Sequence, residues 1–394
     1  MIGIICALST AVLTAVPDYT IKVDSLGIGN SWRAGDINPL HLTVSNVNSE
    51  PVAGWISWEV PDGDGDVVAW GRPITLTPNQ DVSTWLYAPV QPWANGNTAW
   101  TVRVRSLEDG SPSEQLASFR FTPQSVNASM LSPKNGAIAV VGTRRLGLHG
   151  LAGAGKSVTV LEPTSIISGL QPEDIPDAWP CFDSIDTLVW ADAKPELDYR
   201  QTKAIEDWIF RGGHFIIILP TIGNPWALGS PESALASILE DVTPTVGNTS
   251  LGSLHHVLGK SKQDSDMTMT VRSFDEPDAS PIFTLPDGRV IAITKDVGVG
   301  MCTIIGVDLA DRRLGSIGLP QADVFWNRVL GRRGDTPSPM VLQKLEDLDL
   351  LSGTIPSSTT LPMGSIAAQV IAMSTTAGGR LSTVFMLVIA YIIV

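Results

Sequence analysis

The chain has 394 residues, of which 43% are hydrophobic and 17% are charged, and its formal net charge is −14 at pH 7. This length exceeds what a single core ordinarily holds and indicates two domains, while the apolar content excludes long disordered tracts. The negative charge argues against nucleic acid as a partner, because such binding rests on basic patches.

The first segment, residues 1–17, is an apolar run from Ile2 to about Val16. A run of this kind with small residues near its end is typical of a signal peptide, although basic residues are missing at its start. An uncleaved N-terminal anchor is the alternative. Export would place the following domains on the extracytoplasmic side of a membrane.

Residues 18–123 alternate between apolar and polar positions. The stretch "LHLTVSN" puts Leu40, Leu42 and Val44 on one face, and "AWTVRVRS" repeats the pattern. Clusters of Pro, Gly, Asn and Asp separate such stretches at intervals suited to turns. This pattern predicts an antiparallel β-sandwich.

Tryptophan is concentrated in this region, which holds seven of the 12 in the chain. Trp58 and Trp100 are in phase with the apolar face and are expected to pack in the core. Trp55, Trp70 and Trp93 could face outward and stack on sugar rings. A carbohydrate-binding surface protein is therefore one alternative function.

The stretch "PDGDGDVVAW" places Asp62, Asp64 and Asp66 like the first ligands of a calcium loop. That loop also requires Gly at its sixth position and Glu at its twelfth, where this chain has Val67 and Pro73. We interpret the stretch as an acidic hairpin turn.

A linker over residues 124–136 leads to a second domain, residues 137–331, with a different pattern. "AIAVVG", "VTVLEP", "IDTLVWAD" and "HFIIILP" are short apolar runs typical of strands buried on both faces. Between the last two, Asp198 and Gln201 form a capping box for a helix that ends at Gly212. This order predicts parallel strands in a three-layer α/β domain, closed by a hairpin over "VIAITKDVGVGMCTII" and a final helix.

Residues 150–157, "GLAGAGKS", match a phosphate-loop motif. In a working phosphate loop the motif opens directly into a helix, whose N-terminus helps to surround the phosphates. Here "VTVLEP" follows, which favours a strand, and Pro163 prevents an early helix. We interpret the motif as a chance match and expect no nucleotide or other cofactor.

The order of a β-sandwich, "LDYRQTKAIEDWIFRGGHFIIILP", "GVGMCTIIGVDLAD" and an apolar tail resembles bacterial cell-envelope membrane proteins with a class I glutamine amidotransferase-like domain. The resemblance covers roughly residues 135–331. It implies a flavodoxin-like fold for the three-layer α/β domain. It also implies membrane partners such as von Willebrand A-type proteins.

The catalytic residues of that family have no counterpart in this sequence. Active members carry a cysteine nucleophile on the turn after the strand that matches residues 215–219, whereas this turn reads "PTIG". Their His-x-Glu pair is replaced by "VDLADRRL". Cys181 and Cys302 lie elsewhere and are expected to be separate thiols. We therefore expect no catalytic residues, and a binding or scaffolding role rather than an enzyme.

A ligand of a parallel sheet is expected at the carboxyl ends of its strands. The candidate ligand-binding residues in the loops at that edge are Gly142, Asp192, Thr221 and Asp308. A hydrolase or transferase that uses Asp192 or Asp308 as acid or base is the remaining alternative. No metal site is expected, and the adjacent His255 and His256, taken as part of a strand, are interpreted as surface residues.

The C-terminal part consists of a connector, residues 332–380, and the uncharged stretch "LSTVFMLVIAYIIV", residues 381–394. As a helix, the stretch would rise about 21 Å, less than the roughly 30 Å of a bilayer core. We expect a truncated transmembrane helix that anchors both domains to the outer side of the cell membrane.

Overall fold

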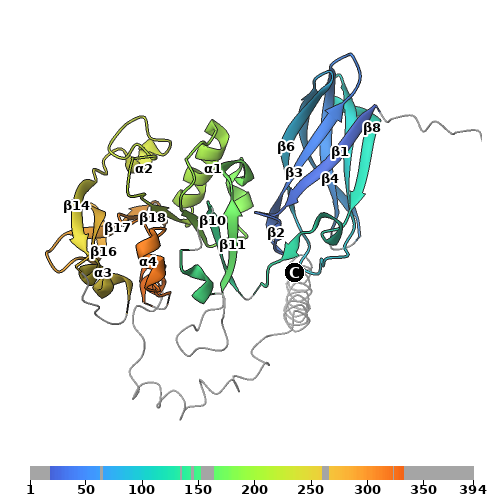
Figure 1. Cartoon of the computed structure of the whole chain (residues 1–394). Helices are drawn as coiled ribbons and strands as arrows, with labels where there is room; N and C mark the ends of the chain where they lie inside the picture. The colour runs from blue at the N-terminus through green and yellow to red at the C-terminus, as the bar shows by residue number, and fades with distance from the viewer. Residues whose placement is uncertain are drawn as a thin grey trace, which may run out of the picture. The chain divides into compact units, whose positions relative to one another are not determined.

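The computed structural model describes residues 18–62, 65–133, 135–142, 146–151, 164–259, 266–322 and 324–331 (Figure 1). The chain divides into two units, residues 1–335 and 336–394, and every described residue belongs to the first. The predicted leader, most of the phosphate-loop motif, the connector and the C-terminal apolar stretch lie outside the described residues. Among the described helices, none combines the length and apolar composition that crossing a bilayer requires.

Two antiparallel sheets form the N-terminal sandwich, as the alternation predicts. One sheet has the order β1 (Tyr19–Leu26), β3 (Ile37–Asn46), β6 (Gln80–Pro89). The other has the order β5 (Val67–Leu76), β4 (Val52–Pro61), β7 (Trp100–Glu108), β8 (Ser111–Phe121).

The sandwich core is built around tryptophan. Trp58 and Trp100 are buried, with ring centroids 5.5 Å apart in an edge-to-face arrangement, and Trp32 meets Trp100 in the same way at 5.6 Å. Leu40, Leu42 and Val44 are fully buried, and the three are among the aliphatic residues around these rings. The two tryptophans expected in the core are therefore found there.

The linker region is short and ordered where it is described. It contains a 3-10 turn, η1 (Gln124–Val126), and a two-residue strand, β9 (Ser129–Met130), which pairs in parallel with β2 (Ser31–Trp32). This pairing ties the start of the second region to the sandwich.

The second region is organised by a seven-stranded sheet. Its order is β11 (Thr164–Leu170), β10 (Gly136–Val141), β12 (Thr187–Trp190), β13 (His214–Ile218), β18 (Gly300–Ile305), β17 (Val290–Val297), β16 (Ser280–Thr284). The first five strands run parallel, and β17 and β16 are antiparallel additions. Both faces of the central strands are buried, which agrees with their unbroken apolar sequences.

Helix α1 (Tyr199–Phe210) covers one face of this sheet. Asp198 and Gln201 form the predicted capping box, with each side chain accepting from the other residue's main-chain N–H at 2.8 and 3.0 Å. The helix buries Ala204, Ile205, Trp208 and Ile209 in the core against the sheet.

The prediction of a three-layer, flavodoxin-like α/β domain is wrong, because the described chain is mostly strand. Helix α1 has 12 residues and α3 (Leu251–Leu258) has eight, whereas α2 (Ala236–Leu239), α4 (Arg312–Ser316) and α5 (Phe325–Val329) have four or five. Between β11 and β12 the chain makes only two 3-10 turns, η3 (Pro172–Asp174) and η4 (Trp179–Phe182). A further antiparallel pair, β14 (Thr245–Ser250) with β15 (Thr268–Ser273), lies between β13 and β16 in the chain, and α3 stands between its two strands.

The physical reason lies in the composition of the connections. Pro172 and Pro180 stand in the two turns that replace a helix after β11, and "GNPWALGSPES" after β13 repeats Pro and Gly. Proline is accepted in the first turn of a helix but interrupts it further in, and glycine has a low helix propensity. Parallel pairing is therefore present without the regular helical layers that we had expected.

A buried polar chain crosses the sheet at His214 in β13. Its Nε2 lies 2.8 Å from the hydroxyl of Thr303 in β18, which lies 2.8 Å from the hydroxyl of Thr294 in β17. Burial lowers the pKa of His214 from 6.5 to about 4. The ring is therefore neutral in the folded protein at pH 7.

This histidine predicts a loss of stability in acid. As pH falls below 6.5 the unfolded chain binds the proton first, so the stabilisation present above pH 6.5 disappears toward pH 4, by about 3 kcal/mol. Urea unfolding at pH 7 and pH 4, compared between the wild type and His214→Asn, measures this contribution. The same pH dependence in both proteins would contradict it.

Candidate functional site

A cavity of about 420 Å³ opens at the carboxyl ends of β12, β13 and β18. Its walls come from three loops, residues 190–194, 218–226 and 308–310. This is the edge of a parallel sheet at which ligands are generally bound, and the volume suits a small ligand or a side chain. We call this cavity the crevice.

The four candidate residues meet at the crevice. Asp192 and Asp308 line it, whereas Thr221 and Gly142 lie behind these two acids. Gly142 has a φ of +114°, and a Cβ at this position would come within 2.1 Å of Oδ1 of Asp192. A side chain at position 142 would therefore collide with the wall of the crevice.

Asp308 holds two loops together. Its Oδ2 accepts from the main-chain N–H of Thr221 at 3.1 Å and from the Thr221 hydroxyl at 2.9 Å, and its Oδ1 accepts from the N–H of Ala310 at 3.0 Å. Three donors on one carboxylate make the residue a tie between β18 and the turn after β13. This arrangement favours a positioning role over acid–base chemistry.

Arg272, on β15, is a second tie that sequence reasoning missed. It is only 6% exposed, its Nη2 donates to the carbonyl of Gly223, and its main-chain N–H donates to Gly306 at 2.7 Å. Burial lowers the pKa of its guanidinium. A lone arginine within the alternating strand "MTVRSF" was the available signal.

The floor of the crevice is aromatic and was also missed. The rings of Trp190 and Trp226 are each 1% exposed and meet edge to face at 5.1 Å. The indole N–H of Trp190 donates to the carbonyl of Ala193 at 2.7 Å, and the amide of Asn224 bonds the main chain of Leu228 at 3.1 Å in both directions. Trp190 could have been anticipated from its place at the end of a buried strand.

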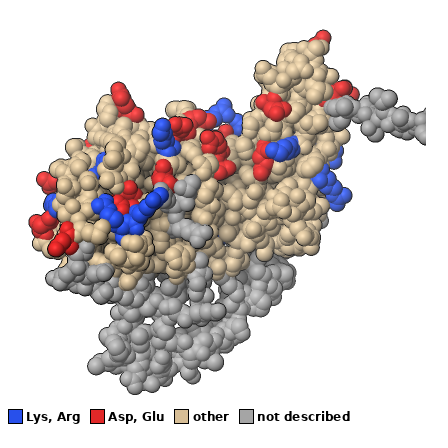
Figure 2. Space-filling model, in the orientation of Figure 1, with Lys and Arg blue, Asp and Glu red and all other residues tan. Residues whose placement is uncertain are grey.

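One apolar side chain projects at the rim. Ile222, in the tied turn after β13, is 86% exposed. The turn is held on either side by the Asp308 and Arg272 contacts, so this isoleucine is presented by a fixed loop. On the face shown in Figure 2, acidic and basic residues are interspersed, and no broad region of a single charge is seen.

The thiols and imidazoles of the described chain lie away from the crevice. Cys181 and Cys302 are unpaired, as predicted, and fully buried, and burial raises the pKa of Cys302 to about 12 and that of Cys181 well above its usual value. Neither therefore forms a thiolate readily. His214 bonds Thr303, and His41 stacks on Trp85 at 4.3 Å. In the described ranges, no three His, Cys, Asp or Glu side chains are grouped to hold a metal ion.

The interpretation of both His255 and His256 as surface residues of a strand is wrong. They lie in α3, and His255 is only 6% exposed. Consecutive residues of a helix are rotated by about 100°, so one of the pair faces the core.

The outward-facing tryptophans do not form one platform. Trp70 pairs in register with the buried Trp58 and so points to the core side of its sheet, whereas Trp55 precedes Ile56 and points to the other side. Trp93 lies on a loop and is 62% exposed. Asp62 and Asp66 join β4 to β5, and the N–H of Asp62 donates to the carbonyl of Asp66 at 2.7 Å, as expected for a hairpin; Asp64 lies outside the described residues.

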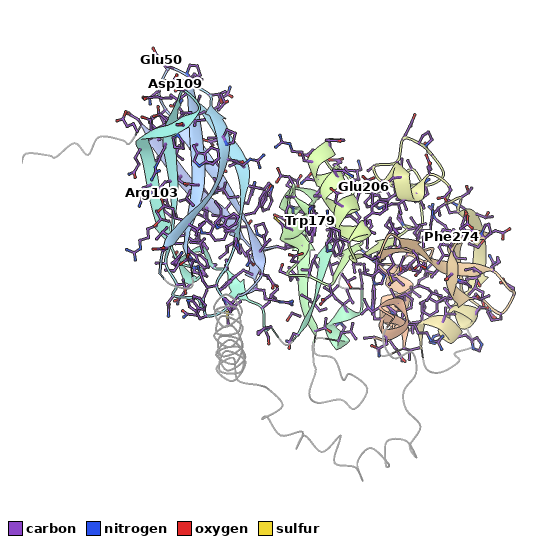
Figure 3. The ribbon with its side chains drawn as sticks, turned by 180° about the vertical axis from the view of Figure 1, so that it is seen from behind. Glu50, Arg103, Asp109, Trp179, Glu206 and Phe274 are labelled. Carbon is purple, nitrogen blue, oxygen red and sulfur yellow. The ribbon has the colours of Figure 1, made fainter. Side chains whose placement is uncertain are left out.

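Arg103 and Trp179, both labelled in Figure 3, each take part in a contact with a side chain of opposite or complementary charge. Arg103 pairs with Glu59 at 2.9 Å on the outer face of the four-stranded sheet, and the guanidinium of Arg211 stacks on Trp179 at 4.1 Å. Glu50 and Asp109 lie at one end of the sandwich, and Arg103 lies nearer its middle (Figure 3).

Comparison with known proteins gives a partial match. The family model of a domain of unknown function, DUF8726, matches residues 18–122. No curated protein matches the chain. Among solved structures, the mmIFT52 N-terminal domain is 12% identical with a TM-score of 0.31, covering 51% of this chain and 99% of its own.

Two further solved structures have the same low sequence identity to this chain. The exo-beta-1,4-mannosidase Op5Man5 from Opitutaceae bacterium strain TAV5 is 12% identical with a TM-score of 0.27, and the match covers 48% of this chain but 32% of the mannosidase. A CARDB domain from Pyrococcus furiosus is 12% identical with a TM-score of 0.18, covering 29% of this chain and 89% of its own. At these scores the likenesses assign neither a fold nor an activity to this chain.

The contact between Gly142 and Asp192 predicts that Gly142→Ala destabilises the protein. Gly169→Ala is the matched control, because Gly169 also has a positive φ, +84°, but nothing lies within 4 Å of its Cβ position. We expect each variant to lose about 1–3 kcal/mol of unfolding free energy from backbone strain, and Gly142→Ala to lose more because Asp192 must move. Equal losses in urea unfolding would contradict the contact.

The Asp308 tie predicts that Asp308→Asn loosens the turn after β13. Removing a charged acceptor of three bonds should lower the unfolding free energy by about 1–3 kcal/mol, and Thr221→Val, which loses only the hydroxyl bond, by about 0.5–1.5 kcal/mol. Hydrogen exchange should speed up over residues 219–226 in the first variant. Unchanged exchange over residues 219–226 in Asp308→Asn would contradict the tie. So would an equal increase of exchange over these residues in Asp287→Asn, which changes an exposed carboxylate elsewhere.

Proposed function

We propose that the protein is a membrane-anchored cell-envelope protein that binds or scaffolds other molecules through the crevice and does not catalyse a reaction. The observation that carries this proposal is the use of the crevice's polar groups. The Asp308 carboxylate, the Asn224 amide and the Trp190 indole N–H are each engaged in holding the crevice's own loops.

A catalytic site places a nucleophile next to a base within reach of the substrate. In the described part of this chain, both cysteines are buried in the core and His214 bonds a threonine inside the sheet. The ties instead make a rigid site with an apolar floor and an exposed Ile222 at its rim. Sites whose loops are held in place in this way suit recognition, because little ordering is required on binding.

The proposed partners are other membrane proteins, such as von Willebrand A-type proteins, and the bilayer itself through residues 381–394. An exposed isoleucine on a fixed turn is suited to insertion into a partner's surface. The same placement puts the two folded regions on the extracytoplasmic side of the membrane.

Photo-crosslinking tests the binding role of the crevice. A photoreactive residue at position 222 of the full chain, expressed in the native host, should give a crosslinked product with a membrane protein. The same residue at Val246, which is 62% exposed on β14, is the matched control. A product from position 246 alone, or from neither position, would contradict the proposal.

Membrane fractionation tests the anchor separately. The full chain should stay in the membrane pellet after an alkaline wash, and a chain ending at residue 380 should be released. Protease added to intact spheroplasts should cleave the sandwich. Protection of the sandwich from protease would reverse the proposed topology.

A further inference from the structure

Two exposed turns of the protein contain the same dipeptide, an aspartate followed by a glycine. Asp109–Gly110 joins β7 to β8 in the sandwich, and Asp287–Gly288 lies between β16 and β17 in the second region. Both glycines have a positive φ, +77° and +89°, and nothing lies within 4 Å of the position that a Cβ would take at either. The two turns are therefore alike in sequence and in the space around the glycine.

An aspartate in front of a glycine can rearrange, because glycine has no side chain to shield its main-chain nitrogen. The nitrogen attacks Cγ of the protonated carboxyl, an N–Cγ bond forms, and the N–H proton and the carboxyl hydroxyl leave as water. A water molecule then opens the five-membered imide at either of its carbonyls. Opening at the main-chain carbonyl gives isoaspartate, in which the main chain passes through Cγ, and opening at Cγ restores aspartate. No atom is gained or lost over the two steps.

The turn at Asp287 is restrained against this reaction. Its Oδ2 accepts from Nε and Nη2 of Arg289 at 2.8 and 2.6 Å, and its Oδ1 accepts from the main-chain N–H of the same residue at 3.1 Å. Chiefly through the guanidinium bonds, Arg289 lowers the pKa of Asp287, so the protonated carboxyl that the reaction needs is scarce. The attacking group is also engaged, because the N–H of Gly288 donates to the carbonyl of Leu285 at 2.9 Å.

The turn at Asp109 lacks both restraints. Asp109 is exposed, and its carboxylate has no hydrogen bond or ion pair with any residue that the structure describes. Within the described ranges, the N–H of Gly110 has no main-chain acceptor either. Both residues have a positive φ, +50° and +77°, as in the type I′ turn of a two-residue hairpin, whose central peptide group faces solvent. The carboxyl and the nitrogen that would attack it are therefore both free.

We propose that Asp109 is a site of spontaneous isoaspartate formation, and that the contact with Arg289 protects Asp287 from the same modification. Isoaspartate at position 109 lengthens the main chain of a two-residue turn by one carbon atom. The pairing of Glu108 with Ser111 on either side of the turn must then shift. The site lies at one end of the sandwich (Figure 3), is separate from the crevice and does not depend on the function proposed for it.

Ageing of the full chain in detergent tests this assignment without any substitution. After incubation at pH 5 and 37 °C, isoaspartate at each turn is measured by peptide mass spectrometry with electron-transfer fragmentation. Asp109 should convert at least about fivefold faster than Asp287, which is the factor that one hydrogen bond supplies. The same chain aged in guanidinium chloride should convert the two sites at similar rates, because unfolding removes the contacts of Arg289.

Two variants identify the cause of the difference. Arg289→Gln removes the guanidinium from Asp287 and should raise the conversion of Asp287 toward that of Asp109. Asp109→Glu should abolish the modification at position 109, because a glutamate would have to close a six-membered ring. The second variant should leave conversion at Asp287 unchanged.

Four results would overturn the proposal. Asp109 that stays unmodified in the folded chain, or equal rates at the two turns of the folded chain, would exclude it directly. The same ratio of rates in the folded and denatured chains would attribute the difference to the neighbouring sequence and not to the fold. No gain at Asp287 in Arg289→Gln would show that Arg289 is not the protecting group.

Discussion

Burial on both faces of the central parallel strands is the constraint on which the second region depends. Every residue of β12 and β13 is buried, so these strands offer no side chain to solvent along their length. Apart from a few buried polar groups within the sheet, such as His214 and Thr303, the polar residues of this part of the chain stand where the strands end. Asp192, Thr221 and Asp308 all stand at such ends, and this is why they come together although more than one hundred residues separate the first from the last.

The shape of the crevice depends on charged side chains that form hydrogen bonds with other groups of the protein. Asp308 and Arg272 act on the same turn from two directions, the first through the N–H and hydroxyl of Thr221 and the second through the carbonyl of Gly223. A buried arginine is costly unless its donors are bonded, so its contact and the geometry of the turn stabilise each other. The result is a rim that holds Ile222 in solvent above two packed indole rings.

The sandwich leaves some core-facing positions uncovered, because its two sheets have unequal numbers of strands. Four strands cannot be covered fully by three, and the uncovered positions fall on β5 beside the open edge of β6. Proteins usually protect such edges with charges, prolines or covering loops. Here Arg72 reaches over the edge to Trp85, and Pro89 ends the strand, so that the protection is partial.

The sequence by itself determined the local features of this protein. The alternation in "LHLTVSN", the capping box of Asp198 and Gln201 and the buried run "HFIIILP" depend only on neighbouring residues, and each is found as expected. The ends of the parallel strands also identified four residues that meet at one site, because strand direction brings them to one edge. The tertiary structure alone decided how the sheet is covered, since Pro and Gly in the connections replace most of the helices that the α/β rhythm and the family resemblance had suggested. It also decided that Trp226 and Ile222 line the crevice, that Arg272 supports its turn, and that the two sheets of the sandwich have unequal numbers of strands. These contacts join segments whose separation along the chain carries no local pattern.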